Sequence, residues 1–249
     1  MKFGLKPVRQ DAVKFKMTTY AALDKLPQPP PIFGRYFLIQ NWGVLGNDQY
    51  GDCVIAGAAH ETMLWNAEQA RIVPFTDQNV LANYSTITGF NPSDPSSDQG
   101  TDYEAAAQYR RKTGIVDAAG KIHGIDAYLD VTRDPTHLAE AIWLFGAAGI
   151  CLAFPDYAMD QFNRGQPWDV VPGQPEPTEG HYVCGVGRNA GGNIVAVTWG
   201  QLQVITPAFL TKYMQAGIAY VSLERLNEKG ISLDGFDQEA LEADLEDLN

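Results

Sequence analysis

Residues 46–53 of the chain read GNDQYGDC, and this loop is the most informative segment of the sequence. It is rich in glycine, asparagine and aspartate, and it runs directly into an alanine-rich segment at 54–70. That composition predicts a buried helix that its neighbours approach closely, with Asp52 where an N-cap belongs. The Cys53 thiol is therefore expected in the first turn of a buried helix.

A cysteine at a helix start has two chemical advantages. The helix N-terminus favours the thiolate, and backbone N–H groups beside an amide side chain can hold a developing oxyanion. Asn47 or Gln49 can supply that amide. The alternative is a buried structural cysteine, which is among the commonest fates of this residue. The loop alone leaves both interpretations open.

A second segment, GHYVCGVG at residues 180–187, places a histidine at the start of a predicted strand. It follows a glycine- and proline-rich loop, and a strand end is a rigid platform from which an imidazole can face a helix N-terminus. His181 and Cys53 in that geometry would form an activated nucleophile. A histidine considered alone is more often a hydrogen-bonded structural residue.

Together these residues resemble the papain-like cysteine peptidases. The nucleophile motif of that family matches residues 51–53, its glycine stretch matches residues 98–100, and its histidine strand matches residues 181–187. The Asn-Ser-Trp-Gly strand of the family corresponds to residues 197–200. The likeness runs in the family's order over roughly residues 40–224, and it is most similar to short bacterial and phage versions without a prosegment.

The resemblance implies a two-lobed α+β fold, with a helical lobe that carries the nucleophile and a lobe built on an antiparallel sheet or barrel. It implies that Cys53 is the nucleophile, that His181 is the base, and that Asn47 or Gln49 is the oxyanion amide. The remaining site residues that it implies bind substrate: Gln99, Gly100, Gly180 and Trp199.

The sequence departs from the family pattern at the position that orients the histidine. The spacing of 16 residues from His181 places Val197 there, and valine cannot form a hydrogen bond. Thr198 is adjacent, but strand alternation predicts that it points to the opposite face. Val54 replaces the aromatic residue that usually follows the cysteine. Because only about 40 residues precede the motif, no long inhibitory prosegment is expected.

Charge is distributed unevenly along the chain. The net charge is −12, yet residues 1–40 hold seven basic and two acidic side chains. A basic arm and an acidic body can attract each other, or each can attract a neighbouring subunit. The overall negative field argues against nucleic acid and anionic lipid as partners. No membrane span or signal peptide is predicted, so the expected location is the cytoplasm, or a virion if the protein is phage-encoded.

We expect three parts: an extended arm at 1–40, a papain-like domain at 41–224, and an acidic tail at 225–249. Within the domain, a helical lobe is expected at about 41–135 and a sheet-rich lobe at about 136–224. In the tail, Leu241, Leu245 and Leu248 share one helix face, which favours docking to a partner or a second copy. Helices are predicted at 103–113 and 136–145. Strands are predicted at 126–131, 150–154, 182–186, 194–198, 203–205 and 218–223.

The other histidines and cysteines are assigned structural roles. His60 lies two helical turns beyond Cys53, too far to act as its base, and is interpreted as a buried core residue. His123 and His137 are expected in surface turns, and Cys151 and Cys184 in apolar strands. No metal site and no cofactor are predicted, because three cysteines and four scattered histidines form no ligand cluster.

Three functions remain open from the sequence. The first is a cysteine hydrolase acting on a peptide, a protein or another amide. The second is a structural or interaction protein built on a decayed hydrolase fold, such as a phage particle component, because fold does not by itself confer function. The third is an acyl transferase that uses the same Cys–His pair. Val197 and the charged ends of the chain favour the second.

Overall fold

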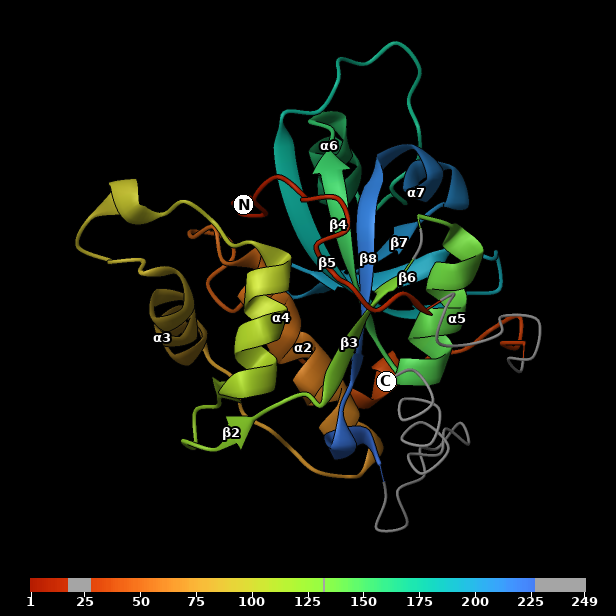
Figure 1. The fold of residues 1–249 in the computed structure, drawn as a ribbon. Helices are drawn as coiled ribbons and strands as arrows, with labels where there is room; N and C mark the ends of the chain where they lie inside the picture. Colours follow the sequence, from red (N-terminus) through yellow and green to blue (C-terminus); the bar gives the residue numbers. More distant parts are fainter. Residues whose placement is uncertain (18–27, 132, 227–249) are drawn as a thin grey trace.

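A computed structural model describes residues 1–17, 28–131 and 133–226 of the chain. Figure 1 shows a group of helices beside a sheet that carries its own helices, with the N-terminal segment crossing the sheet next to α4. The helical group contains α2 (Cys53–Glu68), α3 (Asp77–Thr88) and α4 (Tyr103–Lys112). The helices beside the sheet are α5 (Pro135–Phe145), α6 (Tyr157–Asn163) and α7 (Pro207–Tyr213). The expected α+β fold is confirmed.

A six-stranded antiparallel sheet has the strand order β3-β8-β4-β5-β6-β7. The strands are β3 (Ala127–Val131), β4 (Ala148–Phe154), β5 (Glu179–Arg188), β6 (Ile194–Thr198), β7 (Gln201–Ile205) and β8 (Met214–Val221). A separate two-stranded ribbon joins β1 (Ile115–Val116) and β2 (Ile122–His123). The described residues also contain three single turns of 3-10 helix: η2 (Tyr36–Leu38), η3 (Pro95–Ser97) and η4 (Leu223–Arg225).

The predicted elements lie within a few residues of their expected bounds, and five helices and strands of the described residues were not anticipated: α3, α6, α7, β1 and β2. Helix α3 begins with a capping box between Thr76 and Asn79 and ends at Gly89 in the left-handed region. The segment around α6 was expected to be mostly loop. The ribbon of β1 and β2 is too short to show a periodic pattern, because each of its strands has two residues.

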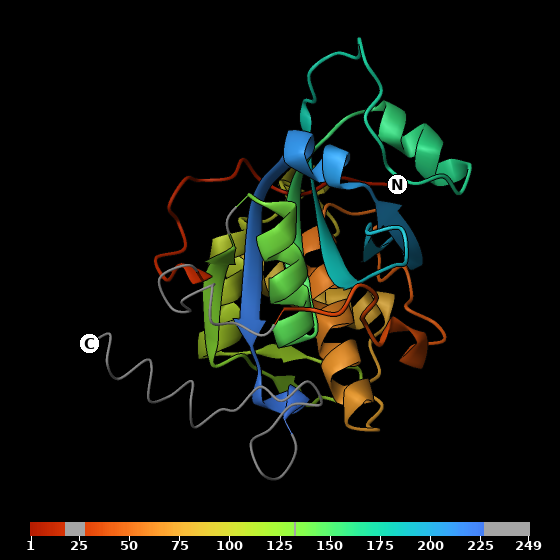
Figure 2. The ribbon, with the colours of Figure 1, turned by 90° about the vertical axis from the view of Figure 1, so that its right-hand side faces the viewer.

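Strand alternation gives the sheet two buried faces. On β4, Ile150 and Leu152 share a hydrophobic cluster with residues of α5, whereas Cys151 lies in a cluster with residues of α2. On β6, Ala196 belongs to the α5 side, and Val197 packs with Leu64 of α2. Figure 2 shows the sheet between these two helices. Because successive side chains point to opposite faces, each helix covers one set of alternate residues.

A buried ion pair fixes α2 against α4 and β5. Arg110 Nη1 of α4 lies 2.5 Å from Glu61 Oε2 of α2, and both side chains are almost completely buried. The Tyr182 hydroxyl of β5 donates to Glu61 Oε1 at 2.7 Å. Gly57 and Gly149 make room for the Tyr182 ring, since an added Cβ at either glycine would overlap it. This contact sets the position of β5, and therefore of His181, relative to α2.

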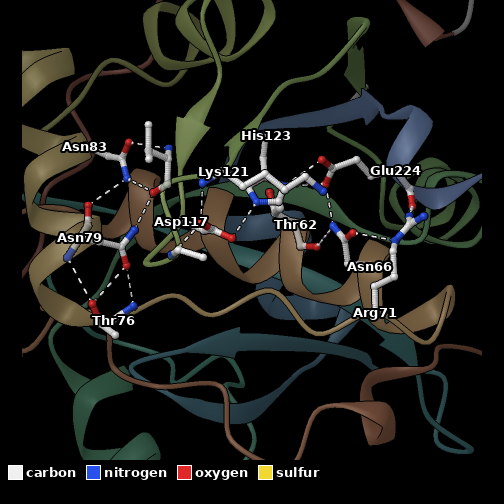
Figure 3. A network of polar contacts seen from close by, with 12 residues as sticks. Thr62, Asn66, Arg71, Thr76, Asn79, Asn83, Asp117, Lys121, His123 and Glu224 are labelled. Carbon is white, nitrogen blue, oxygen red and sulfur yellow. Dashed lines mark hydrogen bonds and ion pairs between the residues drawn. The ribbon is translucent and has the colours of Figure 1, made fainter.

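A second polar network joins α2, the β1–β2 ribbon and η4 (Figure 3). His123 Nδ1 lies 2.8 Å from Glu224 Oε1, and its Nε2 lies 3.2 Å from Asp117 Oδ2. Asn66 of α2 donates to Glu224 Oε2 at 2.6 Å. The prediction that His123 occupies a surface turn is wrong, because its side chain is buried between two carboxylates. His137 lies in α5.

Candidate active site

The loop that precedes Cys53 is held by a side chain from the segment before α4. Gly51 N–H donates to both oxygens of Asp98 at 3.1 Å, and the Tyr84 hydroxyl of α3 donates to Asp98 Oδ1 at 2.7 Å. Asp52 precedes the first residue of α2, but its side chain forms no capping hydrogen bond. Burial raises the pKa of Asp52 well above its ordinary value. The loop therefore positions Cys53 through Asp98 rather than through a cap at Asp52.

Cys53 begins α2 and is buried, with 2% of its surface exposed. Burial raises the pKa of its thiol to about 12, and hydrogen bonds with the backbone of Tyr182, Gly4 and Val54 act in the opposite direction. Tyr182 directly follows His181 on β5, so the thiol lies beside the strand that carries the histidine. In this arrangement the neutral thiol is favoured over the thiolate.

His181 is completely buried, and its ring is fixed by two neighbours. Nε2 lies 2.7 Å from Thr198 Oγ1, while Nδ1 has no hydrogen-bond partner among the described residues. The Trp199 ring stacks on the imidazole, with 4.4 Å between centroids and 15° between planes. Burial lowers the pKa of His181 to about 3, so the neutral imidazole is favoured.

The expectation that Val197 occupies the position that orients His181 is wrong, although Thr198 lies on the opposite face as expected. Cys184 pairs with Val197 across β5 and β6, so these two side chains share the face that α2 covers. His181 is three residues from Cys184 and therefore belongs to the other face. Thr198 does point away from Val197, but that direction leads to His181. The hydroxyl thus supplies the hydrogen bond that valine cannot.

The two candidate oxyanion amides differ in their surroundings. Asn47 is buried, and its Nδ2 donates to the Tyr50 carbonyl at 3.2 Å and to the Lys2 carbonyl at 3.5 Å. Gln49 is exposed, with its backbone N–H bonded to the Gly46 carbonyl. Of the two amides, Asn47 is the one that contacts the segment lying over Cys53.

Residues 2–9, which we call the covering segment, cross this site. Leu5 N–H donates to the Gly180 carbonyl at 3.1 Å, and Thr101 N–H donates to the Gly4 carbonyl at 2.7 Å. Phe3 makes an edge contact with the His181 ring at 5.5 Å between centroids. No motif in the sequence predicts that this segment crosses the site, because its contacts are made by backbone groups and by one aromatic residue.

Glycines allow the covering segment to approach so closely. A Cβ added at Gly4 would lie 1.9 Å from the Gly51 carbonyl oxygen, and one added at Gly100 would lie 2.2 Å from the Gly4 carbonyl oxygen. Gly100 also has a φ of +70°, which glycine adopts without strain. Gly100 and Gly180 therefore contact a peptide segment, whereas the Gln99 side chain is exposed and bonds to the Ser96 carbonyl.

The remaining candidate histidine and cysteines are buried side chains. His60 is a buried core residue as expected, bonded to the carbonyls of Trp42 and Gly43, and burial lowers its pKa to about 4. Cys151 and Cys184 are free, buried thiols in β4 and β5. Over the described part of the chain, no three His, Cys, Asp or Glu side chains are arranged to hold a metal ion. No described helix has the length and apolar composition that crossing a membrane requires.

Solved structures show which fold this is. Xylellain, a cysteine protease from Xylella fastidiosa, matches with a TM-score of 0.65 and 14% identity over 88% of this chain and 96% of its own. The chain has the papain-like fold. A procathepsin B of Trypanosoma congolense matches this papain-like chain with a TM-score of 0.61, at 11% identity over 89% of this chain and 86% of its own.

A cysteine protease of Carica candamarcensis also matches the papain-like chain, with a TM-score of 0.55 and 14% identity over 78% of this chain and 99% of its own. No protein-family model and no curated protein sequence matches it. The similarity is therefore one of architecture, and the roles of individual side chains rest on the geometry described above.

Proposed function

We propose that this papain-like protein is a cysteine hydrolase that cleaves peptides or other amides, with Cys53 as nucleophile and His181 as base. One observation carries the proposal: Thr198 engages Nε2 of His181, which leaves Nδ1 without a partner beside the strand that contacts the thiol. A base held at one nitrogen and open at the other is the arrangement that activates a thiol.

In the proposed reaction, the Cys53 thiol gives its proton to His181, and the thiolate attacks the carbonyl carbon of the substrate. The backbone N–H of Cys53 and the Asn47 amide stabilise the oxyanion. The imidazolium then gives its proton to the leaving amine as the carbon–nitrogen bond breaks, which leaves a thioester. Water, deprotonated by His181, hydrolyses the thioester and releases a carboxylic acid and the free thiol.

The described form is closed to substrate. Both reacting groups are buried, and the shifts of their pKa values favour the neutral pair. The covering segment contributes to this burial, because Gly4 packs against Gly51, two residues before Cys53, and Phe3 contacts His181. Displacing residues 2–9 would admit water to both groups, and their pKa values would move back towards the ordinary range. We therefore propose that activity requires this segment to leave.

A second candidate function is a structural or interaction role, and the burial of Cys53 and His181 favours it. In that case the covering segment is a permanent part of the fold, and the Cys–His pair is inert. With this role we propose a location in the cytoplasm or in a phage particle. In a particle, copies of the chain would associate through their charged ends.

A substitution at Gly4 tests the two functions directly. Valine at this position would place side-chain atoms against the Gly51 carbonyl, so Gly4→Val is expected to unseat the covering segment. We expect an iodoacetamide probe to label Cys53 at least tenfold faster in Gly4→Val than in the parent, with labelling reduced again by His181→Ala. The labelled residue is identified by peptide mapping.

Gly124→Ala is the matched control, since an added Cβ there comes only within 3.5 Å of the Arg110 carbonyl. Its labelling rate should equal that of the parent. A folded Gly4→Val protein whose Cys53 stays unreactive would exclude the hydrolase and leave the structural role. Incorporation of a primary amine into the acyl product, in place of hydrolysis, would identify an acyl transferase.

A further inference from the structure

The covering segment carries a charge pattern that matches the surface beneath it. Arg9 Nε lies 2.7 Å from Asp102 Oδ2, and Arg9 Nη2 lies 2.9 Å from Glu104 Oε2. Both carboxylates lie at the start of α4, a few residues after Gly100. Glu104 also accepts hydrogen bonds from Tyr128 and Gln108, which hold it in place with 9% of its side chain exposed. Arg9 thus meets a preformed pair of carboxylates.

The three basic residues of the covering segment differ in how they are bound. Lys2 Nζ is 3.7 Å from Asp98 Oδ2, a longer contact than those of Arg9. Lys6 donates its backbone N–H to the Thr101 carbonyl, and its side chain forms no ion pair with the described part of the chain. The recognition of charge is therefore local to Arg9, and it is not a general attraction between a basic arm and an acidic body.

Apolar contact and backbone pairing lie next to this ion pair. Leu5 is 7% exposed and belongs to the same cluster as Tyr182 and Ala216, while its backbone bridges to Thr101. Beyond Leu5, a cavity of about 210 Å³ opens between residues 8–11 and the side chains of Tyr103, Asp130 and Ala216. The surface beneath the covering segment therefore encloses the Leu5 side chain, and it leaves a cavity beside Arg9.

We propose that the ligand class of this site is a cationic peptide, in which a basic side chain four residues from a leucine is recognised by Asp102 and Glu104. The inference rests on the proposed function for its link to catalysis, because such a peptide would replace the covering segment next to Cys53. When the covering segment leaves, Asp102 and Glu104 lose their contact with the Arg9 guanidinium. A peptide that takes its place restores this contact only if it carries a cation at the same position.

The test uses binding, which does not depend on catalysis. The protein is the full chain with Gly4→Val to free the site and Cys53→Ala to prevent reaction. The probe is a fluorescein-labelled peptide, Lys-Phe-Gly-Leu-Lys-Pro-Val-Arg-Gln, followed by fluorescence anisotropy. Two variants of the peptide carry glutamate, one at the position of Arg9 and the other at the position of Lys6, so that their net charges are equal.

We expect the peptide changed at the Arg9 position to bind at least tenfold more weakly than the peptide changed at the Lys6 position. In a protein that also carries Asp102→Asn and Glu104→Gln, the two variants should bind within about twofold of each other. Equal affinities in the first protein, a difference that persists in the second, or no binding of the parent peptide would each overturn the proposal. The hydrolase could still be active in those cases, because labelling of Cys53 reports it separately.

A variant of the intact chain provides a second measurement that needs no added peptide. Arg9→Glu should raise the rate of Cys53 labelling by weakening the hold on the covering segment, whereas Lys6→Glu should not. Adding Glu104→Arg to Arg9→Glu should return the rate towards that of the parent by reversing the ion pair. A rate that responds equally to both single changes would show that Asp102 and Glu104 do not select the basic residue.

Discussion

Thr198 Oγ1 lies 2.7 Å from Nε2 of His181, and this contact spans two neighbouring strands of the sheet. It fixes the ring that Trp199 covers, and it leaves the other nitrogen available. A threonine thus forms the hydrogen bond to His181 that the valine indicated by the family pattern could not form.

Replacing Thr198 with valine should slow the Cys53 labelling reaction. In the Gly4→Val background we expect about a tenfold lower rate, the effect of losing one hydrogen bond of about 1.4 kcal/mol. Thr198→Ser keeps the hydroxyl and should retain most of the rate. The measurement is the pseudo-first-order rate of alkylation against pH. A valine variant as fast as the serine variant would show that the hydroxyl does not orient His181.

Introducing asparagine at Val197 should not improve the site. Val197 is 1% exposed and packs with Cys184 and Leu64 on the face away from His181. A buried amide without partners should lower the free energy of unfolding by about 1–3 kcal/mol, measured by urea denaturation. An increase in the labelling rate of Cys53 would contradict the strand register described above.

Gly149→Ala should destabilise the protein because its Cβ would lie 1.9 Å from the Tyr182 hydroxyl oxygen. Overpacking of this kind costs about 1–3 kcal/mol, and the change would also strain the bond from Tyr182 to Glu61. Gly124→Ala, whose added Cβ would lie 3.5 Å from the Arg110 carbonyl oxygen at ordinary contact distance, should unfold at nearly the parental urea concentration. Similar midpoints for the two variants would argue against the close packing of β4 on Tyr182.

The buried pair of Glu61 and Arg110 should respond unequally to single and double changes. Glu61→Leu leaves the Arg110 guanidinium buried without its carboxylate, which should cost about 3–5 kcal/mol in the free energy of unfolding. The double variant Glu61→Leu with Arg110→Met removes both charges and should recover part of that loss. A double variant less stable than the single one would show that the pair is not the reason for the cost.

His123 should make stability dependent on pH. Burial lowers the pKa of this histidine, but its bonds to Glu224 and Asp117 outweigh burial, so the net pKa is raised above 6.5. Burial raises the pKa values of Asp117 and Glu224, and their hydrogen bonds outweigh it, so both are lowered. Two carboxylates accept from one ring, and both ring nitrogens must then be protonated (Figure 3).

The sign of the pH effect follows from linkage. The raised pKa of His123 gives stability that is fully present below about pH 6.5 and is lost as the pH rises through the folded-state value. The lowered pKa values of the two acids give stability that is present above about pH 4.5 and is lost on further acidification. Between these limits His123→Gln should cost about 3 kcal/mol, because it leaves two carboxylates without a cation.

The measurement is the difference in unfolding free energy between parent and His123→Gln at pH 5.5 and pH 9, by urea titration. The difference should be larger at pH 5.5. Taking the difference removes the contributions of His60 and His181, whose lowered pKa values weaken the folded state below about pH 6.5 in both proteins. An equal difference at the two pH values would show that His123 is not charged in the folded protein.

The sequence by itself determined which elements carry the two candidate groups. A glycine-bearing loop before an alanine-rich segment placed Cys53 at a helix start, and β-branched residues after Gly180 placed His181 on a strand. These signals are local, since helix and strand patterns depend on neighbours within a few residues. The tail with Leu241, Leu245 and Leu248 lies outside the described residues, and its docking role stays a prediction.

Only the tertiary structure decided which side chains meet at the site. Thr198 was missed because the pairing of Cys184 with Val197 is set across the sheet and leaves no periodic trace in either strand. The covering segment was missed for a related reason: Gly4, Gly51 and Gly100 come together from three distant parts of the chain through backbone contacts. Such contacts depend on where the chain returns in space, and composition does not encode that position.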